Sequence, residues 1–144
     1  NQDLCREMTQ IIEEELEHFH LVIKLLESRN IPFQRQQPGH YGRELKTLIR
    51  PNEPHRAIDR LLIAGLIEAR SCERFRLLSL HLEDETLREF YHTFMVSEAG
   101  HYSLFIDLAK KYGETDKVNT RWQQLLEYES KIMAAIALRG DRMH

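Results

Sequence analysis

The sequence predicts an all-α protein, built as an antiparallel helical bundle. Four long stretches carry apolar residues at alternating steps of three and four, which is the period of a helix with one buried face. All four prolines lie together in one connection, and no stretch has the alternation of a β-strand. The 144 residues are the size of one domain, so we expect a single domain over residues 1–144.

The breaker residues define the predicted elements in order. The first long helix is expected at about 4–29, before Pro32. A proline-rich connection follows over 30–56, with a short helix expected at about 43–49. The other long helices are expected at about 55–82, 85–112 and 117–138, with Gly113 ending the third. Two tight connections, near 83–84 and 113–116, predict that consecutive helices are antiparallel neighbours.

Charge and composition exclude several classes of protein. The net charge is −3, but residues 29–60 carry seven Lys or Arg against three Asp or Glu, so this stretch is the candidate surface for a negatively charged partner. Two cysteines, Cys5 and Cys72, make no disulfide framework and fit a reducing compartment. No apolar run approaches the roughly 18 residues of a membrane span and no signal peptide is visible, so a cytoplasmic protein without a membrane is expected.

Polar residues interrupt the apolar stripes of three predicted helices. Glu15 and His18 do so in the first helix, Glu68 in the second, and Glu98 with His101 in the third. A buried, unpaired carboxylate costs several kcal/mol. Either these groups share protons or a cation lies among them.

The Glu-x-x-His motif places both side chains on one helix face, but the motif alone is weak because the sequence contains four copies. Two copies, Glu17/His20 and Glu89/His92, lie among polar residues on outward faces. Only the other two interrupt apolar stripes, so these are the predicted ligand pairs.

The level of a residue along its helix indicates which carboxylate of the second helix lies opposite Glu98. With a turn near residues 83–84, the numbers of facing positions add to about 167, so Glu98 faces about position 69. Glu68 lies at that level. Glu73 lies more than one turn away, and we expect it in a salt bridge with Arg70 or Arg76.

Carboxylate and imidazole ligands without a thiolate suit iron or manganese better than zinc. Ferritin-like di-iron bundles use two Glu-x-x-His helices and two helices with a single Glu, so a centre of two iron ions is expected. Only Glu68 is assigned as a single Glu. Glu129 also lies on an apolar stripe. We expect it to be either a ligand or the partner of a histidine or arginine. The alternatives are an ion pair of Glu68 with Arg70 or Arg74, and Cys72 as a small buried residue rather than a ligand.

Two segments resemble a known family. They are Ile-Glu-Ala-Arg-Ser-Cys-Glu-Arg-Phe at 67–75 and Ser-Glu-Ala-Gly-His-Tyr at 97–102. Together with Glu-Glu-Glu-Leu-Glu-His-Phe at 13–19, they are similar to the bacterial tRNA hydroxylases of the MiaE type, and the similarity covers essentially the whole chain. Gly100 departs from the Arg expected there, but it lies off the ligand line. The family has a further upstream helix carrying a ligand Glu, so the chain is expected to be truncated at its N-terminus.

The resemblance implies a non-haem di-iron monooxygenase. Its family hydroxylates the isopentenyl group of a methylthio-isopentenyl-adenosine in tRNA, next to the anticodon, with O₂ and an external electron donor such as a ferredoxin and its reductase. The expected tRNA contacts are cations on phosphates and His40 or Tyr41 stacked on a base: Arg35, His40, Tyr41, Arg43, Lys46 and Arg50. The alternative for these residues is that they belong to a loop exposed to solvent and do not contact tRNA. The competing functions are a non-enzymatic metal-storage or electron-transfer bundle and a metal-free helical interaction module.

Overall fold

The computed structural model describes residues 2–35 and 39–139, with side chains described as far as residue 136. Over these residues the chain forms five helices and no strand: α1 (Gln2–Ser28), α2 (His40–Thr47), α3 (His55–His81), α4 (Glu85–Tyr112) and α5 (Thr115–Arg139). The all-α prediction is confirmed, and the ends of the long helices lie within two residues of the predicted ones. Contacts divide the chain into two compact units, Asn1–Gln37 and Pro38–His144, so the single domain stays a prediction.

The first unit is essentially the helix α1. Its C-terminal end is closed by Asn30, which adopts φ of 54° in the left-handed region that Asn tolerates better than most residues. The backbone N–H of Ile31 then donates to the carbonyl of Leu26 at 2.9 Å. The chain therefore leaves the helix just before Pro32, as predicted.

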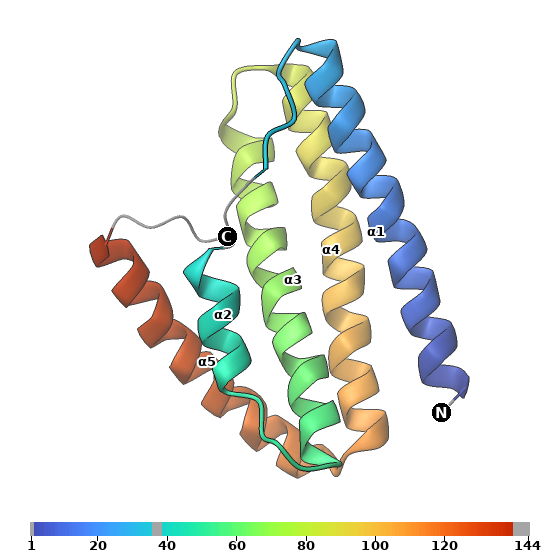
Figure 1. Ribbon diagram of the computed structural model, residues 1–144, viewed down its shortest axis with the longest axis vertical. Coiled ribbons are helices and arrows are strands. Elements are labelled where there is room, and N and C mark those ends of the chain that lie inside the picture. Colours follow the sequence, from blue (N-terminus) through green and yellow to red (C-terminus); the bar gives the residue numbers. More distant parts are fainter. Residues whose placement is uncertain (1, 36–38, 140–144) are drawn as a thin grey trace. The chain divides into compact units, whose positions relative to one another are not determined.

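The centre of the second unit is a hairpin of α3 and α4, which run side by side in opposite directions (Figure 1). Asp84 begins α4, because its carboxylate accepts a hydrogen bond from the backbone N–H of Leu87 at 3.0 Å. Gly65 allows the two helices to approach, since a Cβ there would lie 3.3 Å from Cδ1 of Ile106. The hairpin core contains Leu62, Leu66, Phe94, Phe105 and Leu108.

The chain reverses again at Gly113, for a reason other than a left-handed backbone. Its φ is −125°, but an added Cβ would lie 2.7 Å from Cγ2 of Val118, so any larger residue would force Val118 to shift. Beyond the turn, α5 runs obliquely and contacts α2, α3 and α4 (Figure 1). The predicted antiparallel pairing is thus correct for α3 and α4. Helix α5 contacts α4 but does not lie along it, so the prediction fails for this pair over most of α5.

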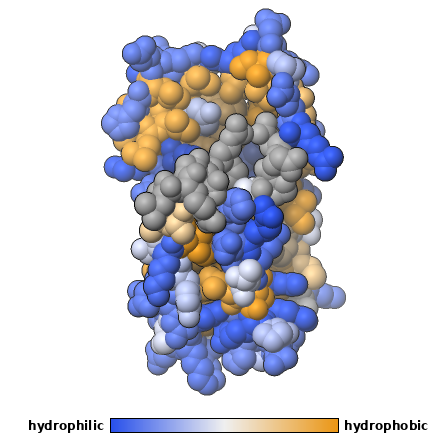
Figure 2. Space-filling view, turned by 60° about the vertical axis from the view of Figure 1, so that its left-hand side comes forward, coloured by the Kyte–Doolittle hydropathy of each residue, from blue (hydrophilic) through white to orange (hydrophobic). Residues whose placement is uncertain are grey.

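A second part of the core lies between α2 and α5. The side chains of Tyr41 and Leu45 on α2 and of Leu125 and Ile136 on α5 are all fully buried. The face drawn in Figure 2 is mainly polar, with separate apolar areas. None of the described helices has the length and apolarity that a membrane span needs.

Candidate metal centre

Three of the predicted ligands meet inside the α3–α4 hairpin. Glu68 comes from α3, and Glu98 and His101 come from successive turns of α4. One ligand atom from each residue lies within 4.8 Å of the others. Glu98 is 6% exposed and His101 is 3% exposed, while Glu68 is half-buried. The predicted level of Glu68 opposite Glu98 is therefore confirmed.

The other predicted pair lies on α1. Within that helix, Nδ1 of His18 lies 3.4 Å from Oε1 of Glu15. This distance follows from the three-residue spacing, which places both side chains on one helix face. Helix α1 thus presents a carboxylate and an imidazole on one face, as predicted, but Glu15 is exposed and His18 is half-buried rather than both being buried.

The chemistry of the hairpin cluster fits a bound cation. Two carboxylates this close together repel each other, and burial increases the cost of that repulsion. A metal ion removes it, and the donor set of carboxylate oxygens with an imidazole nitrogen suits iron or manganese. Glu68, Glu98 and His101 are therefore compatible with a metal site.

Cys72 lies near this cluster, but its environment disfavours metal ligation. Burial raises the pKa of its thiol, and the negative charge of Glu98 raises it further. Its Sγ donates a weak hydrogen bond to the carbonyl of Met95 at 3.5 Å. Since the thiolate is the form that binds metals, Cys72 fits the alternative of a small residue in the hairpin.

A positively charged side chain, that of Arg74, also lies beside the cluster. The guanidinium of Arg74 is half-buried, packs 5.4 Å from the ring centroid of Phe75, and donates one long hydrogen bond of 3.4 Å to Oγ of Ser71. Burial lowers the pKa of Arg74, and the negative charge of Glu98 partly opposes this effect. Arg74 therefore adds positive charge on the Glu98 side of the site.

Glu129 on α5 belongs to a separate buried network. Its Oε1 accepts from the hydroxyl of Tyr41 at 2.6 Å, and from Nε and Nη2 of Arg70 at 3.2 and 3.1 Å. Arg70 also pairs with Glu73. The predicted roles of Glu129 as an arginine partner and of Glu73 in a salt bridge are confirmed. Through Arg70, the network reaches α3 two residues from Glu68.

The same network corrects the expectation for Tyr41. Its side chain is 1% exposed, and its hydroxyl is committed to Glu129, so the predicted stacking of Tyr41 on a base is wrong for this conformation. Burial, followed by the hydrogen bond to Glu129, raises its pKa well above the usual value. The aromatic ring that looked like a loop residue is part of the core because α2 begins at His40.

The other candidate tRNA contacts lie where a partner could reach them, with one qualification. Arg35, His40, Arg43 and Lys46 are exposed. Arg50 is partly buried and donates from Nε and Nη2 to the carboxylate of Asp59 at 2.9 and 2.7 Å. Arg50 therefore has a structural role, whatever else it contacts.

Asp59, which was not among the predicted site residues, is fully buried and binds two arginines. A signal was present, because Asp59 lies three and seven residues before Leu62 and Leu66 on the same apolar face. Its partner Arg121 lies between Val118 and Leu125 on the buried stripe of α5 in the same way.

The comparison with family models decides which family this is. Residues 1–144 match the model described as tRNA-(MS[2]IO[6]A)-hydroxylase (MiaE). The chain belongs to this family. The resemblance seen in the sequence is thereby confirmed.

Two curated MiaE-family relatives carry the name tRNA 2-(methylsulfanyl)-N(6)-isopentenyladenosine(37) hydroxylase. The protein from Pseudomonas putida is 42% identical over 112 residues, covering 78% of this chain and 54% of the relative. The protein from Salmonella typhimurium is 36% identical over 139 residues, covering 96% of this chain and 49% of the relative. The chain therefore spans about half the length of the curated relatives it matches.

A solved structure from Synechococcus, described as Protein 43 with aldehyde deformylating oxygenase activity, is also similar. It is 39% identical, with a TM-score of 0.80, over 83% of this chain and 59% of that one. The likeness confirms a ferritin-like helical fold for this MiaE-family chain.

Proposed function

We propose that this chain forms a di-iron centre and contributes it to an O₂-dependent tRNA hydroxylase. The proposed substrate is a methylthio-isopentenyl-adenosine next to the anticodon, hydroxylated on its isopentenyl group. The observation that carries the proposal is the buried cluster of Glu68, Glu98 and His101 in a chain of the MiaE family.

The proposed ligands are these three residues together with Glu15 and His18 of α1. This set provides three carboxylates and two imidazoles, the types of ligand that ferritin-like di-iron proteins use. Bound iron would supply the reaction with O₂, with electrons from an external donor such as a ferredoxin and its reductase. These side chains would hold the metals, and the buried rings of Phe94 and Phe105 in the same hairpin would limit the access of water.

The exposed cations of the connection support tRNA as the substrate. Arg35, Arg43 and Lys46 can meet phosphates and His40 can stack on a base, whereas Arg50 would act while still paired with Asp59. A tRNA substrate also assigns the reaction to the cytoplasm.

The alternative function is a non-enzymatic metal-storage or electron-transfer bundle. The test is to load the chain with ferrous iron without oxygen, add O₂, and measure O₂ consumption with and without tRNA that carries the prenylated adenosine. Hydroxylation of that adenosine, with O₂ uptake that depends on the tRNA, supports the hydroxylase. Iron oxidation at the same rate with and without tRNA, and no hydroxylated nucleoside, supports the alternative.

A further inference from the structure

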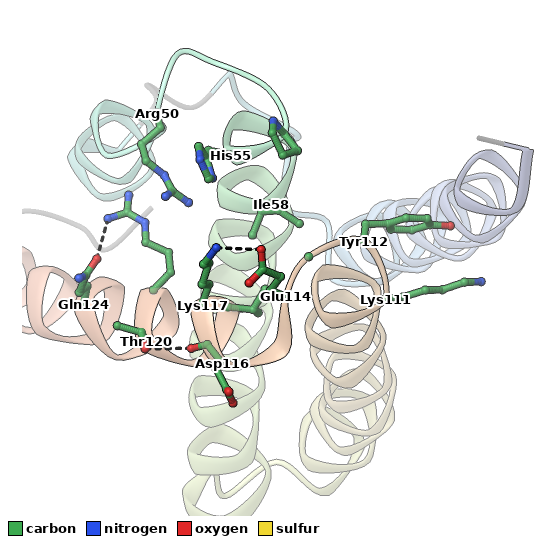
Figure 3. Close-up of a pocket in the computed structure, with 14 residues that line it drawn as sticks. Arg50, His55, Ile58, Lys111, Tyr112, Glu114, Asp116, Lys117, Thr120 and Gln124 are labelled. Carbon is green, nitrogen blue, oxygen red and sulfur yellow. Dashed lines mark hydrogen bonds and ion pairs between the residues drawn. The ribbon is translucent and has the colours of Figure 1, made fainter.

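A cavity of about 650 Å³ lies at the opposite end of α3 from the hairpin turn (Figure 3). Its walls come from the connection before α3, the start of α3, the α4–α5 turn and the first turns of α5. Ile58 and Val118 supply apolar wall, and Arg50, His55, Lys117 and Arg121 supply cationic or titratable groups. Ile58 precedes Glu68 by ten residues, so the cavity lies about 15 Å along α3 from the metal cluster.

Two arginines of this cavity share one carboxylate. Asp59 is 0% exposed, and it accepts hydrogen bonds from Arg50 at 2.7 and 2.9 Å and from Nε and Nη2 of Arg121 at 3.0 Å. Burial raises the pKa of Asp59, but the hydrogen bonds from both arginines lower it more, so the carboxylate is ionised. Two guanidinium charges against one carboxylate leave a positive charge fixed in the cavity wall.

The two arginines differ in the donors that remain. Arg121 also donates from Nη2 to the carbonyl of Leu48 at 2.7 Å and from Nη1 to Oε1 of Gln124 at 3.3 Å. Arg50 uses Nε and Nη2 on Asp59, and its Nη1 makes no hydrogen bond to any described residue. Because Asp59 holds the guanidinium in place, little side-chain entropy is lost when Nη1 binds an anion.

The remaining groups reinforce this charge. Arg50, His55 and Lys117 point toward the same space in Figure 3, whereas the carboxylate of Asp116 points away from Arg50 and His55. The other carboxylate of the lining, Glu114, pairs with Lys117 at 2.8 Å, and both of these groups are exposed. With Asp59 and Glu114 counted against Arg50, Lys117 and Arg121, one positive charge remains, in a chain whose net charge is −3.

We propose that this cavity binds a phosphate group through Arg50, His55 and Lys117. The phosphate is either a phosphodiester of an RNA strand or a free phosphate. Planar guanidinium and ammonium groups are the side chains that bind phosphate best. The RNA source rests on the proposed function, with this end of the molecule holding the strand away from the reacting nucleoside.

The test uses the metal-free chain and two probes, inorganic phosphate and a labelled anticodon stem-loop RNA. The variant is Lys117→Gln, because Lys117 is exposed and its replacement leaves Asp59 and its arginines intact. The matched control is Lys131→Gln, an exposed lysine farther along α5 and outside the cavity. His55→Gln is a second variant that tests the opposite wall.

If the proposal is right, inorganic phosphate shifts the NMR amide signals of the cavity residues, and Lys117→Gln weakens this binding about tenfold. If RNA is the source, the same variant also weakens RNA binding and reduces its salt slope by about one. Weaker phosphate binding with unchanged RNA affinity supports a free phosphate as the ligand.

The proposal is overturned if phosphate shifts no cavity signal, or if Lys131→Gln weakens phosphate binding as much as Lys117→Gln and His55→Gln do. Neither probe requires iron. A chain that binds phosphate in the cavity but does not hydroxylate tRNA would contradict the proposed function and leave this inference standing.

Discussion

At the scale of single residues, burial distinguishes Glu98 and His101 from the other Glu-x-x-His pair of α4. The sequence contains four Glu-x-x-His copies. They differ only in whether the pair lies on the apolar face of its helix. The structure supports that separation on α4, where Glu98 and His101 are buried while Glu89 and His92 are exposed. Motif and burial pattern together are specific, although neither is specific alone.

The first prediction compares the two histidines of α4. Replacing His101 by Ala removes an imidazole from the buried cluster, so binding of a metal pair should be lost. Replacing exposed His92 by Ala should leave it unchanged. Iron per chain after anaerobic loading, with circular dichroism to verify helicity, measures both. Equal iron content in the two variants would remove His101 from the proposed centre.

The second prediction concerns Tyr41. The variant Tyr41→Phe deletes the donor to buried Glu129, so the free energy of unfolding should fall by about 1–3 kcal/mol. The raised pKa of Tyr41 adds a pH dependence. The neutral hydroxyl contributes its full stability below the unfolded pKa of about 10, and this contribution is lost as pH rises further.

Urea unfolding of both proteins at neutral pH and above pH 10 measures this effect. The wild type should lose more stability than Tyr41→Phe over that interval, so the two curves should converge. A constant difference between them would show that the ionisation of Tyr41 is not coupled to folding. Tyr128→Phe, at an exposed tyrosine of α5, is the matched control.

At the scale of elements, Asp59 joins three segments of the second unit. It lies in α3, and its arginine partners come from the connection after α2 and from α5. Asp59 thereby ties the first turns of α5 to α3 and to the connection after α2. The cluster therefore holds the start of α5 against the other two segments.

The third prediction follows from this arrangement. Asp59→Asn leaves two partly buried guanidinium groups without their carboxylate, so the free energy of unfolding should fall by roughly 3–5 kcal/mol. The exposed residue Asp107 on α4 is the control, and Asp107→Asn should change stability little. Thermal unfolding followed by circular dichroism compares them. A similar melting temperature in both would show that the cluster adds no net stability.

Acid should have a related effect on the wild type. The pKa of Asp59 is lowered in the folded chain, so its contribution is complete above the unfolded pKa of about 3.9 and is lost as pH falls below it. Asp59→Asn should therefore show a weaker loss of stability between neutral and acid pH than the wild type.

At the scale of the whole molecule, charge is unevenly distributed along the chain. Residues 29–60 are positive, while the first 28 residues are negative. An RNA partner would meet the positive stretch first, because electrostatic attraction guides association. The buried pair of Arg50 with Asp59 means that only part of this charge is available to RNA.

The fourth prediction tests that stretch. Arg43→Glu reverses an exposed charge, so it should weaken tRNA binding and flatten its salt dependence while iron content stays the same. Arg50→Glu is a poorer probe, since it would set a second carboxylate against Asp59. Filter binding at several salt concentrations provides the measurement. Unchanged affinity for Arg43→Glu would remove Arg43 from the proposed RNA contacts.

The features that the sequence predicts and those that it does not predict differ in the sequence separation of the contacts that produce them. Helix ends and the level of Glu68 opposite Glu98 follow from local period and one short turn, so the sequence predicted them. The direction of α5, the burial of Tyr41 and the pairing of Asp59 depend on contacts between segments 9 to 88 residues apart. A single sequence carries no direct signal for such pairs, although apolar neighbours of Asp59 indicated its burial.

The short sequence separation of the hairpin's metal-site residues bears on how the protein folds during its synthesis. Glu68, Glu98 and His101 are at most 33 residues apart in sequence and are joined by one tight turn. Contacts of such low sequence separation form early and quickly during folding. During synthesis, these three of the five proposed ligands can come together as soon as α4 has left the ribosome, before α5 exists. An early cation would then act as a folding nucleus, and the timing of metal supply would influence the yield of native protein.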